Sequence, residues 1–179
     1  AMMVNLLIGP AFSLIPILIV NHFGGGALEL ASMESAFGIG MVLGGIVLGV
    51  WGGFKRRILT LMVCIILTGI GLTVLGLTPP TAFPQAVGAM FFAGLMLPIV
   101  NGSIFAVFQT TVPPRMQGRV TLMMSGSTAM TPVRLAIAGP VSDALGVQIW
   151  FWIGGTAMVS IGIISFFTPA VMQIEERTA

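Results

Sequence analysis

Two charged side chains lie inside long apolar runs of the sequence, where a charge is costly. Glu34 lies about one turn inside the run at 31–53, and Arg134 follows Pro132 in the run at 119–142. An intramembrane carboxylate can exchange a proton, and an arginine can bind an anionic group or pair with the carboxylate. The alternatives are a carboxylate that faces outer water and an arginine whose charged end extends to the surface.

Prolines and polar side chains interrupt two further apolar runs at matching places. The six residues are Asn5, Pro10 and Ser13 in the run at 2–21, and Pro98, Asn101 and Gln109 in the run at 84–109. Proline in a helix frees a backbone carbonyl, which an amide or a water can then bind. Interrupted spans at matching positions in two halves indicate a transporter's binding region. We predict a small-molecule cavity here; the alternative is that prolines are simply common in membrane helices.

The sequence has few residues for enzyme chemistry. One histidine, one cysteine and five carboxylates cannot build a convincing metal site or nucleophilic triad. We therefore predict no enzyme activity, no metal and no cofactor. We expect Cys64 to be a small buried hydrophobe and His22 to be a solvated loop residue, with pH sensing as the alternative. A net charge of +2, without basic residues interleaved with aromatics, argues against nucleic acid.

The composition is that of a membrane protein. Hydrophobic residues make up 56% of the chain and charged residues 7%, whereas soluble domains have about 25% charged residues. About 20 apolar residues cross a bilayer as a helix. We predict one all-α domain over 1–179 in contact with lipid. Its six spans are expected at 2–21, 31–53, 57–78, 84–109, 119–142 and 148–169.

The loops between these runs are short, so they alternate between two faces of the membrane. Six of the seven basic residues fall on one face. They are Lys55, Arg56 and Arg57 in the second loop, Arg115 and Arg119 in the fourth, and Arg177 in the tail. The positive-inside rule makes that face cytoplasmic, with both termini. The second run also has glycines four apart, Gly40/Gly44, Gly45/Gly49 and Gly49/Gly53, and such spacing lets helices approach closely.

The start of the chain is already apolar. It begins with Ala1, and its first charged residue is Glu29, so the basic region of a signal peptide is missing. We expect the sequence to be a fragment of a longer protein.

Three segments resemble the C-terminal half of a major facilitator superfamily transporter: "GVWGGFKRR", "VPPRMQGRV" and "AIAGPVSDALGV". The likeness is greatest to macrolide-efflux-like bacterial drug exporters. The first segment matches the family's Gly-x-x-x-Asp-Arg-x-Gly-Arg-Arg loop motif through Gly49 and the basic residues 55–57. Gly53 stands where that motif has its acid. "AGPV" is similar to the family's Gly-Pro antiporter motif.

The resemblance implies that the six spans are helices seven to twelve of the family fold, arranged as two inverted three-helix repeats. It implies half of a secondary active transporter in the bacterial inner (plasma) membrane. The expected activity is proton-coupled export of amphipathic small molecules by alternating access. The missing N-terminal half, or a second copy, would complete the cavity. The alternatives are a non-transporting interaction module and a small self-assembling channel.

Overall fold

All secondary structure that the computed structural model describes is helical. The described residues are 12–52, 57–111, 116–118, 121–122 and 146–167. The elements are α2 (Ile15–Asn21), α3 (Ala27–Trp51), α4 (Arg57–Leu77), α5 (Phe83–Thr111) and α8 (Val147–Phe167). The last four are long and apolar enough to cross a membrane. The prediction of an all-α membrane fold is confirmed.

The four long helices overlap four of the six predicted spans. The largest difference is at α3, which starts at Ala27, four residues before the predicted 31–53. Gly26 precedes it, and the Glu29 carboxylate accepts the Gly26 backbone N–H at 2.7 Å. That bond satisfies one of the free N–H groups at the helix start, so the helix begins within a loop-like glycine run. Nearly all of the span at 119–142 and the first half of the span at 2–21 lie outside the described residues, so the count of six stays a prediction.

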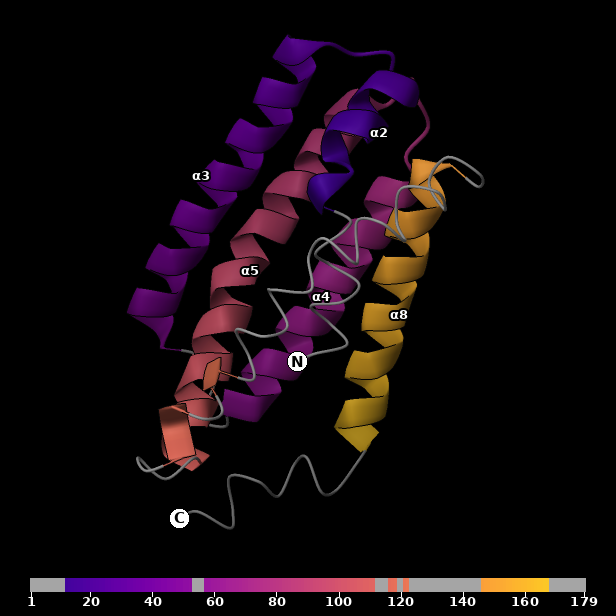
Figure 1. Cartoon of the computed structure of the whole chain (residues 1–179). Coiled ribbons are helices and arrows are strands. Elements are labelled where there is room, and N and C mark those ends of the chain that lie inside the picture. Colours follow the sequence, from indigo (N-terminus) through magenta and orange to yellow (C-terminus); the bar gives the residue numbers. More distant parts are fainter. Residues whose placement is uncertain (1–11, 53–56, 112–115, 119–120, 123–145, 168–179) are drawn as a thin grey trace.

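The long helices pack side by side as a layer. α3 packs against α5, α5 against α4, and α4 against α8, while α2 contacts both α3 and α8. Figure 1 shows α3, α5 and α8 running in one direction and α4 in the opposite one. The end of α3 and the start of α4 therefore lie at the same end of the layer as the end of α5.

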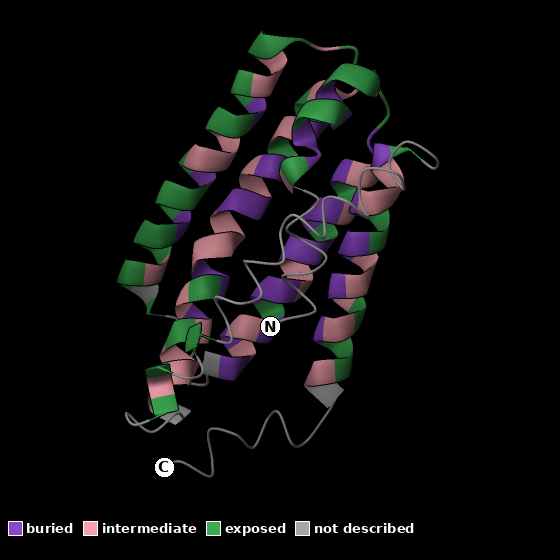
Figure 2. Ribbon diagram, viewed as in Figure 1, coloured by how far each residue is buried: buried purple, intermediate pink, exposed green. Residues whose placement is uncertain are grey.

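The buried side chains lie between the helices. Leu18 of α2, Leu72 of α4, Met90 of α5 and Phe151 of α8 belong to one apolar cluster and are each at most 2% exposed. Figure 2 shows α3 mostly exposed along its length and α4 mostly buried. Large apolar side chains are exposed on α3 and α8, where lipid is the expected neighbour.

Candidate functional site

α2 is held against α3 and α5 by two aromatic contacts. The rings of Phe12, just before α2, and Phe37 of α3 have centroids 4.9 Å apart. Phe23, just after α2, meets Phe83 at the start of α5 edge-on, with centroids 5.5 Å apart. The segment 12–23 therefore crosses from one helix of the α3–α5 pair to the other.

Asn101 lies on the same side of α5 as Phe83. The two residues are 18 positions apart, which is five helical turns and about 27 Å along the axis. The Asn101 side chain is exposed. Ser13, the residue after Phe12, also has an exposed side chain in the described part of the structure. These two predicted cavity residues thus belong to the elements that border one side of the helix layer.

Pro98 and Gln109, the other predicted cavity residues of α5, lie within about 80° of Asn101 around the helix, because they are three positions before it and eight positions beyond it. Pro98 is half-buried within the helix and lacks an N–H for the carbonyl of Gly94, one turn earlier. Gly94 itself lies against Phe37, so Pro98 is near the side that α3 covers. Gln109 is exposed, eight positions beyond Asn101. Asn5 and Pro10 lie outside the described residues.

Glu34 is exposed on a face of α3 that has small neighbours. Gly38 and Gly45 follow it at helical spacing, and Gly49 lies one turn further. Among the described residues, a Cβ placed on any of these three glycines would meet nothing within 4 Å. Met41, which is 40% exposed, lies between Gly38 and Gly45 on this face, and Ile46, 56% exposed, lies about 100° around the helix from Gly45. We call the residues Glu34, Gly38, Gly45 and Gly49 the Glu34 face. Arg134 lies outside the described residues, so its pairing with Glu34 stays a hypothesis.

The seam between α3 and α5 is built on glycines. Gly40 and Gly44 of α3 face the backbone of α5 around Leu95, and Gly94 of α5 faces the backbone of Phe37. A Cβ on Gly40 would lie 2.9 Å from the Leu95 nitrogen, and one on Gly44 would lie 2.9 Å from the Leu95 carbonyl carbon. Real Cβ atoms do not come this close, so the two backbones can touch only because these side chains are absent.

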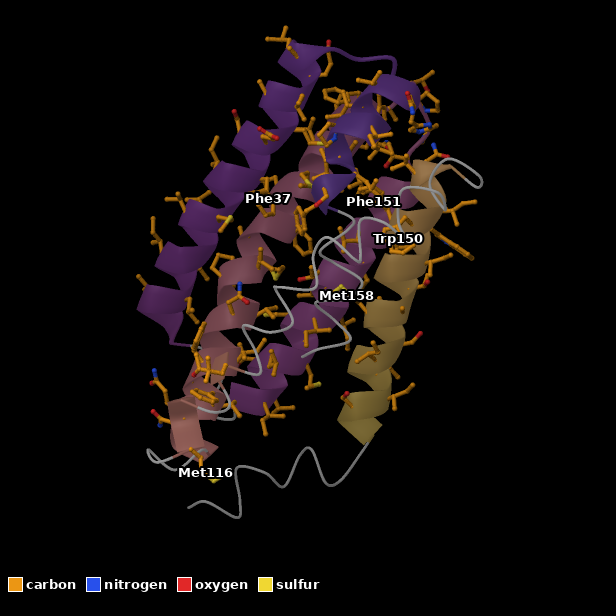
Figure 3. All side chains as sticks on the ribbon, viewed as in Figure 1. Phe37, Met116, Trp150, Phe151 and Met158 are labelled. Carbon is orange, nitrogen blue, oxygen red and sulfur yellow. The ribbon has the colours of Figure 1, made fainter. Side chains whose placement is uncertain are left out.

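A second glycine seam joins α4 and α8. A Cβ on Gly69 would lie 2.8 Å from the Gly155 oxygen, and one on Gly76 would lie 2.8 Å from the Trp152 nitrogen. The Thr73 hydroxyl beside this seam donates to the Gly69 carbonyl at 2.8 Å, within its own helix. Phe151 and Met158 of α8 are each 1% exposed beside the same contact (Figure 3). Both seams thus bring helices together backbone to backbone.

The predicted cytoplasmic loop motif is described only in part. Gly49 is helical and exposed, three residues before the helix stops at Gly52, whose φ of 70° ends α3 in the left-handed region. Arg57 is the first residue of α4. Gly53, Lys55, Arg56 and Arg119 lie outside the described residues, as does "AGPV".

Sequence reasoning missed a polar cluster formed by His22. The half-buried ring donates from Nε2 to the Thr78 carbonyl at 2.9 Å, and the Gln148 side-chain amide contacts the ring. These partners are 56 and 126 residues away along the chain, so no local pattern reveals them. His22 is therefore not the solvated loop residue that the sequence led us to expect. The sequence did contain one hint of a partner. Pro79 and Pro80 follow Thr78 and have no N–H groups, so carbonyls at the end of α4 need hydrogen-bond donors from elsewhere in the chain.

The two tryptophans at the start of α8 differ in their surroundings. Trp152 is 46% exposed, which suits an interfacial anchor. Trp150 instead packs against the apolar cluster (Figure 3). Within the described residues its indole Nε1 is buried without a hydrogen-bond partner.

Comparison with known proteins extends this picture. The family model of the Major Facilitator Superfamily matches residues 1–177. Macrolide efflux protein A of Streptococcus pyogenes is 33% identical over 168 residues, which is 93% of this chain and 41% of that protein. Multidrug efflux pump Tap of Mycolicibacterium fortuitum is 31% identical over 150 residues, 82% of this chain and 36% of Tap. No solved structure gives a significant match.

The chain spans less than half the length of the curated relatives that it matches. The family match covers nearly all of its residues and agrees with the apolar, glycine-seamed helices described above. The chain is therefore a multi-pass membrane protein that belongs to the Major Facilitator Superfamily.

Proposed function

We propose that the chain is the C-terminal part of a secondary active transporter that exports amphipathic small molecules. The observation that carries this proposal is the match of 93% of the chain to a relative named macrolide efflux protein A. A second relative is named a multidrug efflux pump. We propose that export is coupled to proton entry, that access alternates between the two membrane faces, and that the protein is not an enzyme.

The proposed cavity lies on the side of the layer bordered by Ser13 and Asn101. Support comes from their exposure and from the aromatic contacts that hold the segment 12–23 across α3 and α5. A hydroxyl and an amide beside apolar helices suit an amphipathic molecule, which needs a few polar contacts and much apolar surface. Asn5 and Pro10 are proposed to extend this cavity.

The rest of the transporter is proposed to cover the Glu34 face. Glu34 is the eighth residue of α3, and a charged side chain within a lipid-facing helix is costly, so such residues usually face protein or water. The open glycines below Glu34 leave room for a second helix to approach closely. Because the matched part is 41% of macrolide efflux protein A, enough chain remains in a protein of that kind to supply this helix. A second copy of this chain is the competing occupant.

The proposed location is the bacterial inner membrane, with the loop at 53–56 on the cytoplasmic side. Lys55 and Arg56 support this orientation, since basic residues concentrate in short cytoplasmic loops. A cysteine introduced at Lys55, in a variant with Cys64→Ser, is expected to resist an impermeant thiol reagent in whole cells. It should react once the cells are opened. Labelling in intact cells would reverse the orientation.

Macrolide efflux from cells tests the function. The complete protein, expressed in cells that lack their own pumps, should lower the accumulated macrolide, and an uncoupler should abolish the effect. Flux through this chain alone that ignores uncouplers would indicate a channel instead. Absence of flux in every combination of chains would indicate a non-transporting module.

A further inference from the structure

Three exposed side chains form a stripe along the second half of α5. Asn101, Phe105 and Gln109 follow one another at intervals of four residues and are all exposed, Phe105 by 58%. Each interval advances about 6 Å along the helix and about 40° around it, so the two amides are about 12 Å apart along the axis with the phenyl ring between them. Figure 2 shows exposed positions in this half of α5. We call these three residues the α5 stripe.

The neighbours of Asn101 determine which side of α5 the stripe occupies. Val100 is 5% exposed within the apolar cluster, and Gly102 lies against Leu48 of α3. Asn101 therefore projects between the core and α3. Phe83, on the same side near the start of α5, is covered by the aromatic contact next to α2. The side of α5 that is covered at Phe83 is thus open at Asn101.

The two amides restrict what can lie against the stripe. Neither the Asn101 nor the Gln109 side chain forms a hydrogen bond within the described part of the chain. Asn101 is ten positions before the last residue of α5, which is about 15 Å along the axis. Lipid tails offer no hydrogen bonds, so an amide at this place requires water, protein or a bound molecule beside it. Phe105, between the amides, has the same surroundings.

The stripe is chemically neutral. The sequence of α5 from Phe83 to Thr111 contains no charged residue. Each amide can both donate and accept hydrogen bonds, and the phenyl ring offers a flat apolar surface. These groups suit a large apolar molecule with hydroxyl, carbonyl or ether oxygens at two edges. They offer no counterion for a charged group.

We propose that the α5 stripe binds the apolar body of an exported molecule on Phe105 and its neutral oxygen groups on Asn101 and Gln109. This inference deepens the proposed function and rests on it. It makes Phe105 a specificity-determining residue, because the ring lies where a molecule that reaches both amides must cross. Such a molecule spans about 12 Å between its polar edges, and a macrolide, a large ring with hydroxyl and carbonyl groups, belongs to this class.

Protection of a cysteine tests where the molecule binds. Phe105→Cys is placed in the complete protein, with Cys64 and any other cysteine changed to serine, and its reaction with a small neutral maleimide is timed in membranes. Erythromycin, a macrolide, at about ten times its Kd for this variant should slow the reaction about tenfold, because about nine sites in ten are then occupied. Ile163→Cys, near the same end of α8 and 45% exposed at Ile163, is the matched control and should not respond.

Side-chain truncation tests what the stripe contributes to binding. Phe105→Ala should raise the Kd of radiolabelled erythromycin about 5- to 30-fold, as for loss of an aromatic contact. Asn101→Leu and Gln109→Leu should each raise it about 2- to 10-fold, the effect of one hydrogen bond. Ile163→Ala should leave the Kd unchanged. All four variants should melt at similar temperatures, because the side chains that they replace are exposed.

The outcomes separate this inference from the proposed function. If the thiol of Phe105→Cys does not react without erythromycin, another part of the protein or lipid covers the stripe, and the inference is wrong. Equal rates with and without erythromycin, or the same Kd in Phe105→Ala and Ile163→Ala, would also overturn it while the unmodified protein still exports the drug. Binding without export would contradict the proposed function and leave the protection experiment to decide the stripe. A protein that neither binds nor exports erythromycin would contradict both.

Discussion

Gly44 and Gly45 are adjacent residues that should respond oppositely to the same substitution. A Cβ on Gly44 would lie 2.9 Å from the Leu95 carbonyl carbon and closer still to its oxygen, whereas one on Gly45 would meet nothing within 4 Å. We therefore predict that Gly44→Ala separates α3 from α5 and that Gly45→Ala leaves their seam intact. Chemistry, helix and local sequence are otherwise the same, so Gly45→Ala is a close control.

The expected loss in free energy of unfolding follows from the overlap between a Cβ on Gly44 and the Leu95 backbone. An ordinary Cβ contact is about 3.4 Å or longer, so α3 must retreat by about 0.5 Å at this carbon and further at the oxygen. Overpacking of this kind costs about 1–3 kcal/mol. Alanine recovers up to about 1 kcal/mol of helix propensity at both positions. Because that gain is common to both variants, Gly44→Ala should lower the free energy of unfolding by about 1–3 kcal/mol relative to Gly45→Ala, which is a Tm difference of about 2–12 °C for a chain of this size.

Cys64 supplies the assay. It is the only cysteine of the 179 residues and is 5% exposed within α4. A maleimide dye that fluoresces on reaction will report its exposure as the chain, purified in detergent, is heated. If Gly44→Ala melts at the same temperature as Gly45→Ala, or above it, the backbone contact between α3 and α5 does not exist.

Three further predictions concern other helix surfaces. Gly155→Ala should lower the free energy of unfolding by about 1–3 kcal/mol, because its Cβ would lie 2.5 Å from the Thr73 nitrogen, and thermal melting with the same dye measures this. Thr68→Val should change the free energy of unfolding by less than about 1 kcal/mol, because among the described residues the Thr68 hydroxyl donates to the Cys64 carbonyl of its own helix; a larger loss would mean that it has another partner. In the complete protein, Gly45→Leu should reduce macrolide efflux and stability, while Ile46→Leu on the lipid side should not; equal effects would remove the proposed docking of the Glu34 face.

The sequence predicted the helices well because each is a long apolar run bounded by turn residues. Four such runs overlap α3, α4, α5 and α8. It also identified Gly40/Gly44 as a close-packing pair, and the structure places both against α5. Gly45/Gly49 has the same spacing yet is open. Spacing states which residues share a face of a helix, but not which helix, if any, that face meets.

The candidate site was harder to predict because its parts meet only in three dimensions. His22, between Asn21 and Phe23 and just before three glycines, has the local sequence of a loop residue. Its partners Thr78 and Gln148 lie at the ends of two other helices. Hydrogen bonds across such distances depend on where those helices end and on how they stack. The amino-acid sequence around His22 indicates neither where the other helices end nor how they stack.

The two kinds of contact in this layer suggest which parts move together. α3 and α5, and likewise α4 and α8, meet through glycines, backbone to backbone, and such seams tolerate little displacement because any sliding brings atoms into overlap. The segment 12–23 is attached instead by aromatic rings and by the His22 bonds, which can rotate or exchange partners at modest cost. In an alternating-access cycle we expect the two seamed pairs to move as rigid bodies. We then expect the adjustable joint at α2, where the proposed cavity residue Ser13 and the hydrogen-bonded ring of His22 stand at opposite ends of one short helix.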